Sequence, residues 1–283
     1  WVTDSSTPGA GTITAAMIAT GADFTFNSIG IGKGANSVAG NTVLGELALD
    51  AAVTGGNNTA IGKNALTANT SATNNVAIGV SALQASTTAG ANTAVGKDAL
   101  KSNTAANNVA VGADSLEVNT SGTSNTALGT FALHVNTTAN NNTGIGYSSL
   151  LANTTGANNV AVGAYTLDAN TTAAGNTAVG YSSLSANTTG PGGTAVGYGT
   201  LIANTTGSNN TAVGYAALDA CTTGVDNTAV GVNANGAVTT GSYNMAFGRN
   251  ANNGCTTGNA NVAIGYTTLS ANTASNNTGV GHG

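Results

Sequence analysis

Large apolar residues recur at two fixed distances from a repeated glycine along most of this chain. The glycine stands at residues 45, 62, 79, 96, 112, 129, 146, 163, 180, 197, 214, 231, 248, 265 and 281, so twelve intervals are 17 residues long and two are 16. With this repeat glycine as position 0, position −1 is always large and apolar, and position +4 is leucine in twelve coils, with Asn235 and Asn252 as the exceptions. A fixed short period indicates one structural unit stacked on itself.

The residues before the repeat glycine alternate in size and polarity. Position −3 is Thr or Val except at Met245, position −2 is Ala or Gly except at Val43, and position −1 is Val, Ile, Leu or Phe. Alternation among β-branched residues predicts a short strand. We expect the position −1 row to face the interior together with the leucine row, which would lie on a second short strand. The small position −2 row would then face outward.

The remaining positions of each coil predict turns. Position −4 is Asn in fourteen of fifteen coils, with Gly193 as the exception, and both residues suit tight corners. The two 16-residue intervals are one residue shorter than the others, and the missing residue falls after the Asn-Thr pair, so both apolar rows stay in phase. Helical repeats need longer units and few glycines, and a flexible Gly- and Asn-rich tract would not keep apolar residues at a fixed phase. The sequence therefore predicts an all-β fold, a parallel β-solenoid or β-roll of about 14 coils and roughly 65–70 Å in length.

The repeat divides the chain into three parts. Residues 1–26 lack the repeat, and we interpret them as a connector from a preceding shaft or anchor region. Residues 27–45 form an atypical first coil, because the repeat glycine after Gly32 follows only 13 residues later, and a shortened terminal repeat is typical of a capping unit. Residues 46–283 form the repeat β-roll, which stops within a repeat, so we expect a segment of a longer protein.

One chain of this kind buries few large side chains. Two apolar side chains per coil, at about 1.5–3 kcal/mol each, offset only a small part of the entropy lost when a coil is ordered. An outward row restricted to Ala and Gly would suit a close neighbour. We therefore predict that the position −2 row packs against copies of the same chain, most simply in a parallel homotrimer. The alternative is that these small residues fit a tight turn within one chain.

The repeated phrase Asn-Thr-Ala-Val-Gly, followed by a small residue and Leu, resembles the head repeats of YadA-like trimeric autotransporter adhesins. Their phrase is Ser-Val-Ala-Ile-Gly, which residues 75–79 and 261–265 approach, and their period is shorter. The fuller pattern at 176–190 and 210–224 is also similar to repeats of tail-fibre-domain proteins, including phage tail fibres. The resemblance covers about residues 27–283. It implies a left-handed parallel β-roll, homotrimeric association and, for a fibre, a trimerising or self-cleaving chaperone domain beyond Gly283.

Charged and catalytic residues are sparse. Five basic and ten acidic side chains give a net charge of −5 without a basic patch, so we do not expect nucleic-acid binding. No apolar run is long enough for a membrane-spanning helix. His134 and His282 stand at variable positions, and Gly30–Gly34 lacks the spacing of a phosphate-binding loop. We therefore expect no enzymatic activity, no cofactor and no metal site.

The two cysteines stand at the same position of the repeat. Cys221 and Cys255 are both seven residues after a repeat glycine and two coils apart, which exceeds the reach of a disulfide. We expect free thiols that fill a position usually held by Asn. A bond between chains would require that this row lie on the axis of a trimer.

Tyrosine is the most distinctive surface residue. Position +1 carries Tyr147, Tyr181, Tyr198, Tyr215 and Tyr266, whereas other coils have residues such as Lys, Thr or Arg there. This variation indicates an exposed row, in which tyrosines of consecutive coils stack about 4.8 Å apart. Exposed aromatic rows contact sugar rings or partner surfaces, so we predict a glycan or partner contact at these five residues. The alternative is that they only stabilise the rod through cross-strand contacts.

Together these patterns predict a structural protein, the rod of an extracellular fibre that holds an adhesive tip away from its base. The first expectation is a virion tail fibre or receptor-binding fibre of a phage, and the alternative is a bacterial cell-surface adhesin head. Expected partners are copies of the same chain, other fibre or anchor proteins, and a host surface receptor or glycan, without direct membrane insertion. An ice-binding solenoid is a third hypothesis, which the mixture of Thr and Val at position −3 disfavours. A glycan-cleaving tailspike would need clustered carboxylates, but the acidic residues of the repeats are expected to lie scattered along the rod: Glu46, Asp50, Asp98, Asp114, Glu117, Asp168 and Asp219.

Overall fold

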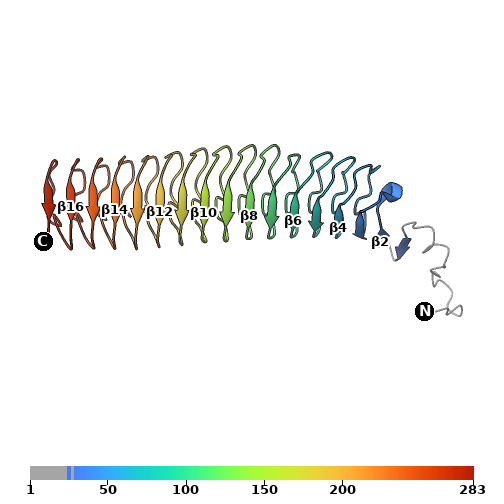
Figure 1. Cartoon of the computed structure of the whole chain (residues 1–283), viewed down its shortest axis with the longest axis horizontal. Helices are drawn as coiled ribbons and strands as arrows, with labels where there is room; N and C mark the ends of the chain where they lie inside the picture. Colours follow the sequence, from blue (N-terminus) through green and yellow to red (C-terminus); the bar gives the residue numbers. More distant parts are fainter. Residues whose placement is uncertain (1–23, 27–28) are drawn as a thin grey trace, which may run out of the picture.

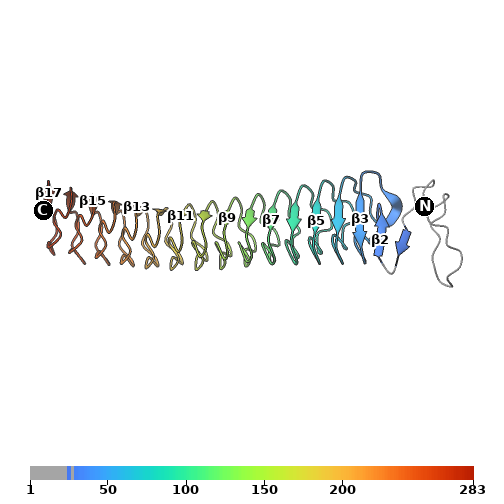
Figure 2. The same cartoon turned by 90° about the horizontal axis from the view of Figure 1, so that it is seen from below.

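The computed structural model describes residues 24–26 and 29–283, which form a long, narrow rod of stacked coils (Figure 1). Each coil from β3 onward contributes one short strand to a single sheet that runs the length of the rod. A view turned about the long axis shows that the row of strands rotates gradually along the rod (Figure 2), as the natural twist of β-sheets requires. The predicted all-β parallel solenoid of about 14 coils with a 17-residue period is confirmed.

The described residues contain seventeen strands, and those from β3 onward pair in parallel, each with the strand one coil away. Their bounds are β1 Phe24–Phe26, β2 Ile29–Gly32, β3 Thr42–Gly45, β4 Thr59–Ile61, β5 Val76–Ile78, β6 Thr93–Val95, β7 Val109–Val111, β8 Thr126–Leu128, β9 Thr143–Ile145, β10 Val160–Val162, β11 Thr177–Val179, β12 Thr194–Val196, β13 Thr211–Val213, β14 Thr228–Val230, β15 Met245–Phe247, β16 Val262–Ile264 and β17 Thr278–Val280. Across the short intervals, Thr93 pairs with Val109 and Val262 with Thr278. The missing residues therefore fall outside the strands, as predicted.

The N-terminal end of the rod has a different strand direction. β2 pairs antiparallel with both β1 and β3, and a short 3-10 turn, η1 (Ala35–Ser37), lies between β2 and β3. β2, η1 and β3 belong to the segment 27–45, for which a capping coil is predicted, whereas β1 is the last part of the predicted connector and pairs with β2 at the end of the sheet. Most of the predicted connector, residues 1–23, lies outside the described residues, as do residues 27–28.

The two sides of the strands face the opposite way from the prediction. Alanine at position −2 points inward, and Ala60 and Ala161 are both 0 % exposed. The large residues at position −1 point outward, and Ile78 and Ile264 keep 36 % and 41 % of their surface exposed. The prediction of an interior Val/Ile row and an outward Ala row is therefore wrong. The leucine row is buried, as predicted, at every coil from Leu49 to Leu218.

The leucine row explains why the inward position of the strand must be small. Where Gly144 replaces alanine in this row, a Cβ atom would lie 3.3 Å from Leu133 Cγ and 3.0 Å from Ser149 Oγ, so even a methyl group fits tightly. A row of Val or Ile would require more volume than leucine leaves free inside a coil. The small residues at position −2 are therefore explained by packing within one chain, on the strand and not in the tight turn of the alternative prediction.

The leucines lie in a turn and not on the predicted second strand. The chain leaves each strand through the repeat glycine, which has φ +129° at Gly146, and it continues through left-handed residues at Ser148 (φ 54°) and Leu150 (φ 53°). Repeated left-handed residues curl the backbone, so this segment cannot extend as a strand. Bulky residues avoid this conformation, but complete burial of the leucine side chain offsets its cost.

Two rows of buried asparagine connect the coils. At position −4, Asn159 donates its backbone N–H to Asn142 Oδ1 (2.9 Å) and its Nδ2 to the Ala173 carbonyl oxygen (2.9 Å). At position +7, Asn153 Nδ2 donates to Asn136 Oδ1 (2.9 Å), and the same contact is repeated in the neighbouring coils. Buried amides require hydrogen-bond partners, so each row specifies where the next coil lies.

The row at position +7 loses its regular contact where the residue type changes. Cys221 follows Asn204 in this row, and its thiol lies 3.7 Å from the Gly224 carbonyl oxygen and not against Asn204. Asn204 Oδ1 is accordingly buried and has no hydrogen-bond partner within the described part of the chain. The amide of each coil therefore depends on the presence of an amide in the next coil.

Replacing Asn153 by alanine is expected to lower the free energy of unfolding by about 2–3 kcal/mol. The change leaves Asn136 Oδ1 without its donor from this row and removes one of the two acceptors of Asn170 Nδ2, which keeps only the Ala173 carbonyl oxygen. Urea denaturation followed by circular dichroism measures the loss. Ser86→Ala in the same row is the matched control, because Ser86 Oγ donates only to the Ala89 carbonyl oxygen, and we expect it to cost about 1 kcal/mol or less. Equal losses in the two variants would contradict a ladder that couples the coils.

Candidate functional site

One edge of the rod tolerates many residue types. We call positions +1, +2 and +5 the variable edge; in different coils they carry Lys, Val, Tyr, Asp, Ser, Phe, His or Ile. The repeats of one chain provide an internal comparison. Positions −4, −2 and +4 are restricted because they are buried, whereas most side chains of the variable edge are half-buried or exposed. The stack does not restrict this edge, so its residue types are free to serve another purpose.

Charged side chains gather on the variable edge in two adjacent coils. Lys97 Nζ lies 2.6 Å from Asp98 Oδ2 and 3.9 Å from Asp114 Oδ1. Lys101 Nζ lies 3.2 Å from Asp98 Oδ1 and 3.7 Å from Glu117 Oε1. Each lysine therefore links a carboxylate of its own coil to one of the next coil, and the group is an ion-pair network across the stack.

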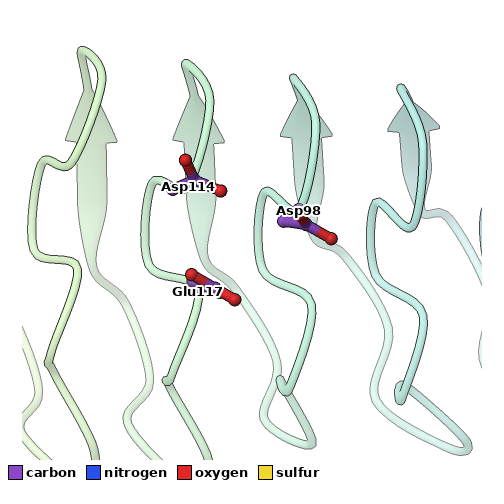
Figure 3. Close-up of side chains that lie close together, drawn as sticks. All are labelled: Asp98, Asp114 and Glu117. Carbon is purple, nitrogen blue, oxygen red and sulfur yellow. The ribbon is translucent and has the colours of Figure 1, made fainter.

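Three carboxylates of this network, Asp98, Asp114 and Glu117, approach one another from neighbouring coils with oxygen atoms within 4.8 Å (Figure 3). Burial opposes the ionisation of Asp98, but hydrogen bonds from Lys97 and Lys101 outweigh it and hold the pKa of Asp98 below its ordinary value. Two ammonium groups therefore already pair with the carboxylates that a cation would need. We assign the cluster to stabilisation of the stack, where exposed ion pairs contribute about 1 kcal/mol or less each.

Six aromatic residues in six consecutive coils form a continuous row on the same edge. We call this row the aromatic stripe; it consists of Phe131, Tyr147, Tyr165, Tyr181, Tyr198 and Tyr215. Neighbouring ring centroids lie between 5.3 and 6.1 Å apart. The tyrosines are exposed, from 38 % at Tyr165 to 56 % at Tyr215. The structure thus brings four of the five predicted tyrosines into one surface, with Tyr165 and Phe131 added.

The fifth predicted tyrosine lies apart from the stripe. Tyr266 contacts the ring of His282, with centroids 5.2 Å apart. The two coils between Tyr215 and Tyr266 carry Val232 and Arg249 at position +1, which interrupts the row of rings. His134, at the other end, stacks edge-on against Phe131 with centroids 5.5 Å apart and links the stripe to the ion-pair network.

A search of position +1 alone misses Phe131 and Tyr165, because both stand at position +2. Their backbone is left-handed, with φ 59° at Phe131 and 56° at Tyr165, and their rings join those of the neighbouring position +1 tyrosines. The signal that could have found them is the presence of one aromatic residue in positions +1 and +2 taken together. Six coils in succession satisfy that condition.

The geometry of the stripe changes at Tyr181. Tyr181, Tyr198 and Tyr215 all start from position +1, and their rings stack with interplanar angles of 11° and 5°. Between Phe131 and Tyr181 the rings start alternately from positions +2 and +1, and neighbours cross at 72–82°. Both arrangements are favourable for aromatic pairs.

The stack itself does not require the stripe. The coils that begin at Gly62, Gly79, Gly96 and Gly112 have no aromatic residue at positions +1 or +2. Their strands nevertheless pair in the same register as those of the aromatic coils. Each aromatic pair contributes about 0.5–1.5 kcal/mol where it occurs, so the rings add local stability in consecutive coils without being needed for the register.

Positive charge is missing around the stripe. No Lys or Arg occurs between Lys101 and Arg249. Asp168 and Asp219, at position +5, belong to the coils of Tyr165 and Tyr215, and burial raises the pKa of both carboxyl groups above the ordinary value. The surface that the stripe presents is therefore aromatic, polar through its phenol groups and without lysine or arginine.

Burial lowers the reactivity of the Cys221 thiol. Cys221 and Cys255 are buried and free, as predicted. Burial raises the pKa of the Cys221 thiol to about 11. The thiol is therefore protonated at neutral pH, and a protonated thiol is a poor nucleophile and a poor metal ligand.

Among the described residues, no helix is long and apolar enough to cross a membrane. Comparison of the chain with protein-family models, with curated proteins and with solved structures finds no match. Support for a function therefore comes from the internal repeats of the chain and from the geometry of the rod.

Proposed function

We propose that this chain is the non-enzymatic rod of an extracellular fibre, associated as a homotrimer, that holds a receptor-binding tip away from its base. In the favoured form the fibre is a phage tail fibre on the virion; the alternative is the head of a bacterial cell-surface adhesin. The observation that carries the proposal is a long parallel sheet whose outer face is uncharged from end to end. A narrow stack of nearly identical coils suits a spacer that must reach far with little chain.

The outer face of the sheet is uncharged along its length and combines one apolar row with a row rich in threonine. We call positions −3 and −1 the sheet face; from Thr42 to Val280 they hold only Thr, Val, Ile, Leu, Met and Phe. Large side chains remain accessible on it, such as Leu44 at 43 % and Phe247 at 40 %. The position −1 row is apolar in every coil, and with the threonine methyl groups beside it the two rows cover about 500–700 Å², which is comparable with the largest patches that soluble monomers usually expose. This face therefore favours a protein partner.

Further copies of the same chain are the partners that fit the sheet face. The face has no charges that would repel an identical face. Copies that run parallel around an axis along the rod place matching residues at the same height, as closed rotational symmetry requires. Their association would bury apolar surface that a single thin coil lacks. The homotrimer stays a prediction, and its expected contact moves from the buried Ala row to the sheet face.

Sedimentation of the purified chain tests the association. We expect a mass near three times the 27.0 kDa of one chain. Combining Val179→Lys with Val213→Lys is expected to dissociate the assembly, because it would bury unpaired charges at the sheet face. Thr189→Lys with Thr223→Lys, at exposed turn positions, is the matched control and should leave the mass unchanged. A wild-type rod that sediments as a stable monomer would end the homotrimer proposal.

Labelling distinguishes the two settings of the fibre. Gold-conjugated antibodies raised against the purified rod are expected to decorate the tail fibres of virions in electron micrographs. Label confined to the surface of uninfected bacteria would favour the adhesin instead. Label restricted to the interior of cells would contradict both forms of the proposal.

A further inference from the structure

The aromatic stripe points to a binding activity beyond that of a spacer. We propose that it binds a neutral, linear, extended glycan that lies along the rod with about one sugar residue per coil. The proposal concerns the surface of a single chain, so it stands whether or not three chains associate. Three properties of the stripe support it: its spacing, its two kinds of ring surface and its lack of positive charge.

The spacing of the rings suits an extended polysaccharide. Ring centroids follow one another at 5.3–6.1 Å, one ring per coil, because the coils are about 4.8 Å apart. Pyranose residues in an extended β-linked chain repeat at a similar interval, so successive sugars can meet successive rings. The stripe spans about five coil spacings, on the order of 25 Å, which gives room for about five or six sugar residues.

The half of the stripe between Phe131 and Tyr181 supplies apolar ring faces. Neighbouring rings cross at 72–82°, so the edge of one ring covers only part of the face of the next. Tyr147 accordingly remains 46 % exposed. The C–H groups on one side of a pyranose carry a slight positive charge and pack well against the negative face of an aromatic ring. This contact requires no charged group.

The other half supplies a row of hydroxyl groups. The rings of Tyr181, Tyr198 and Tyr215 cover each other's faces, so mainly their edges and hydroxyls meet solvent, at 47 %, 55 % and 56 % exposure. Within the described part of the chain, no protein group hydrogen-bonds to these hydroxyls. A phenol hydroxyl both donates and accepts. Three such groups at coil spacing can therefore pair with hydroxyls of successive sugars.

The charge around the stripe selects a neutral ligand. A polyanion such as nucleic acid or a sulfated glycan would find no lysine or arginine between residues 101 and 249. A strongly basic partner would find few available carboxylates, because Asp168 and Asp219 are partly buried and Glu117, at the end of the stripe, already lies within 3.7 Å of Lys101 and 3.5 Å of His134. A neutral polyol meets neither obstacle, and its many hydroxyl groups match the phenol row.

Isothermal titration of the full chain with cellohexaose and with chitohexaose tests the proposal. We expect saturable binding of at least one of these extended β-linked hexasaccharides. The α-linked chain of maltohexaose coils, so we expect its Kd to be at least about tenfold higher than that of the extended sugar. The triple variant Tyr181→Ala, Tyr198→Ala, Tyr215→Ala is expected to weaken binding of the extended sugar by about tenfold or more. Tyr243→Ala is the matched control, because Tyr243 is 63 % exposed but lies outside the stripe, and its binding should equal that of the wild type.

Two further measurements keep the test decisive. Circular dichroism must show that the triple variant is folded; if it is not, Tyr198→Phe, which keeps the ring and removes one hydroxyl, is expected to weaken binding by a few-fold. Absence of binding of both β-linked sugars to the wild type, or unchanged binding by the folded variants, would overturn the proposal. A triple variant that loses self-association would assign the stripe to a contact between copies of the chain and would overturn it as well. The mass of the wild-type assembly is a separate result.

Discussion

Replacing Gly146 by alanine is expected to destabilise the rod by about 3 kcal/mol or more. Gly146 has φ +129°, a backbone conformation that residues with a side chain rarely adopt. A Cβ atom there would also lie 2.5 Å from the carbonyl oxygen of Gly163 and 2.6 Å from its carbonyl carbon. Backbone cannot move aside as a flexible side chain would, so the two coils would have to separate. Urea denaturation of the purified variant measures the loss of free energy.

Gly175→Asn is the matched control for this glycine. Gly175 has φ +72° and no atom within 4 Å of a Cβ placed there, and the same position of other coils holds asparagine, as at Asn158 (φ 60°). We expect a change within about 0.5 kcal/mol. Hydrogen exchange should show that the Gly146→Ala defect is confined to the neighbouring coils, because each repeat contacts only its neighbours. A stable Gly146→Ala rod with unchanged exchange would contradict the close approach of the glycine row.

Leu201→Ala is expected to lower the free energy of unfolding by about 2–5 kcal/mol. The leucine is 0 % exposed and fills the interior of its coil. Truncation removes its contacts and leaves a cavity between the flanking leucines, which a narrow coil held by coil-to-coil hydrogen bonds cannot close. Calorimetry of the wild type and the variant measures the change.

The adjacent residue provides the comparison for this prediction. Ile202→Ala removes the same number of carbon atoms from a side chain that is 38 % exposed on the variable edge. We expect a loss of about 1 kcal/mol or less. If Ile202→Ala were the more damaging of the two changes, the leucine row would not be the core of the rod.

Much of the architecture can be predicted because it is repeated. A glycine every 17 residues, an apolar residue before it and a leucine after it establish the period and the phase of the strands. The repeat also shows that the residue missing from each short interval lies outside the strands. Val95 and Val111, for example, stay paired across a 16-residue interval. The asparagine row at position −4 predicts turns, but the pattern does not show the hydrogen bonds that Asn142 makes in that row or that Asn153 makes in the row at position +7.

The candidate site could be predicted only in part. The tyrosines at position +1 identified the exposed edge, and four of them belong to the aromatic stripe. Phe131 and Tyr165 are not predicted by this row, because they stand at position +2 although their rings lie among those of the position +1 tyrosines. Their rings join the stripe from position +2, where the backbone is left-handed, and that conformation is set by the path of the chain after the repeat glycine.

By itself, the sequence determined that this protein is a stack of β-coils with buried leucines and asparagine turns. These properties follow from residue types that recur at fixed phase, and neighbouring coils impose the same local requirements on each repeat. Only the tertiary structure decided which side of the strand is inside. Alternation shows that a strand has two unlike sides, but the inner side is selected by the volume that the rest of the coil leaves free. Leucine takes up that volume, so alanine faces inward and the larger Val and Ile face outward.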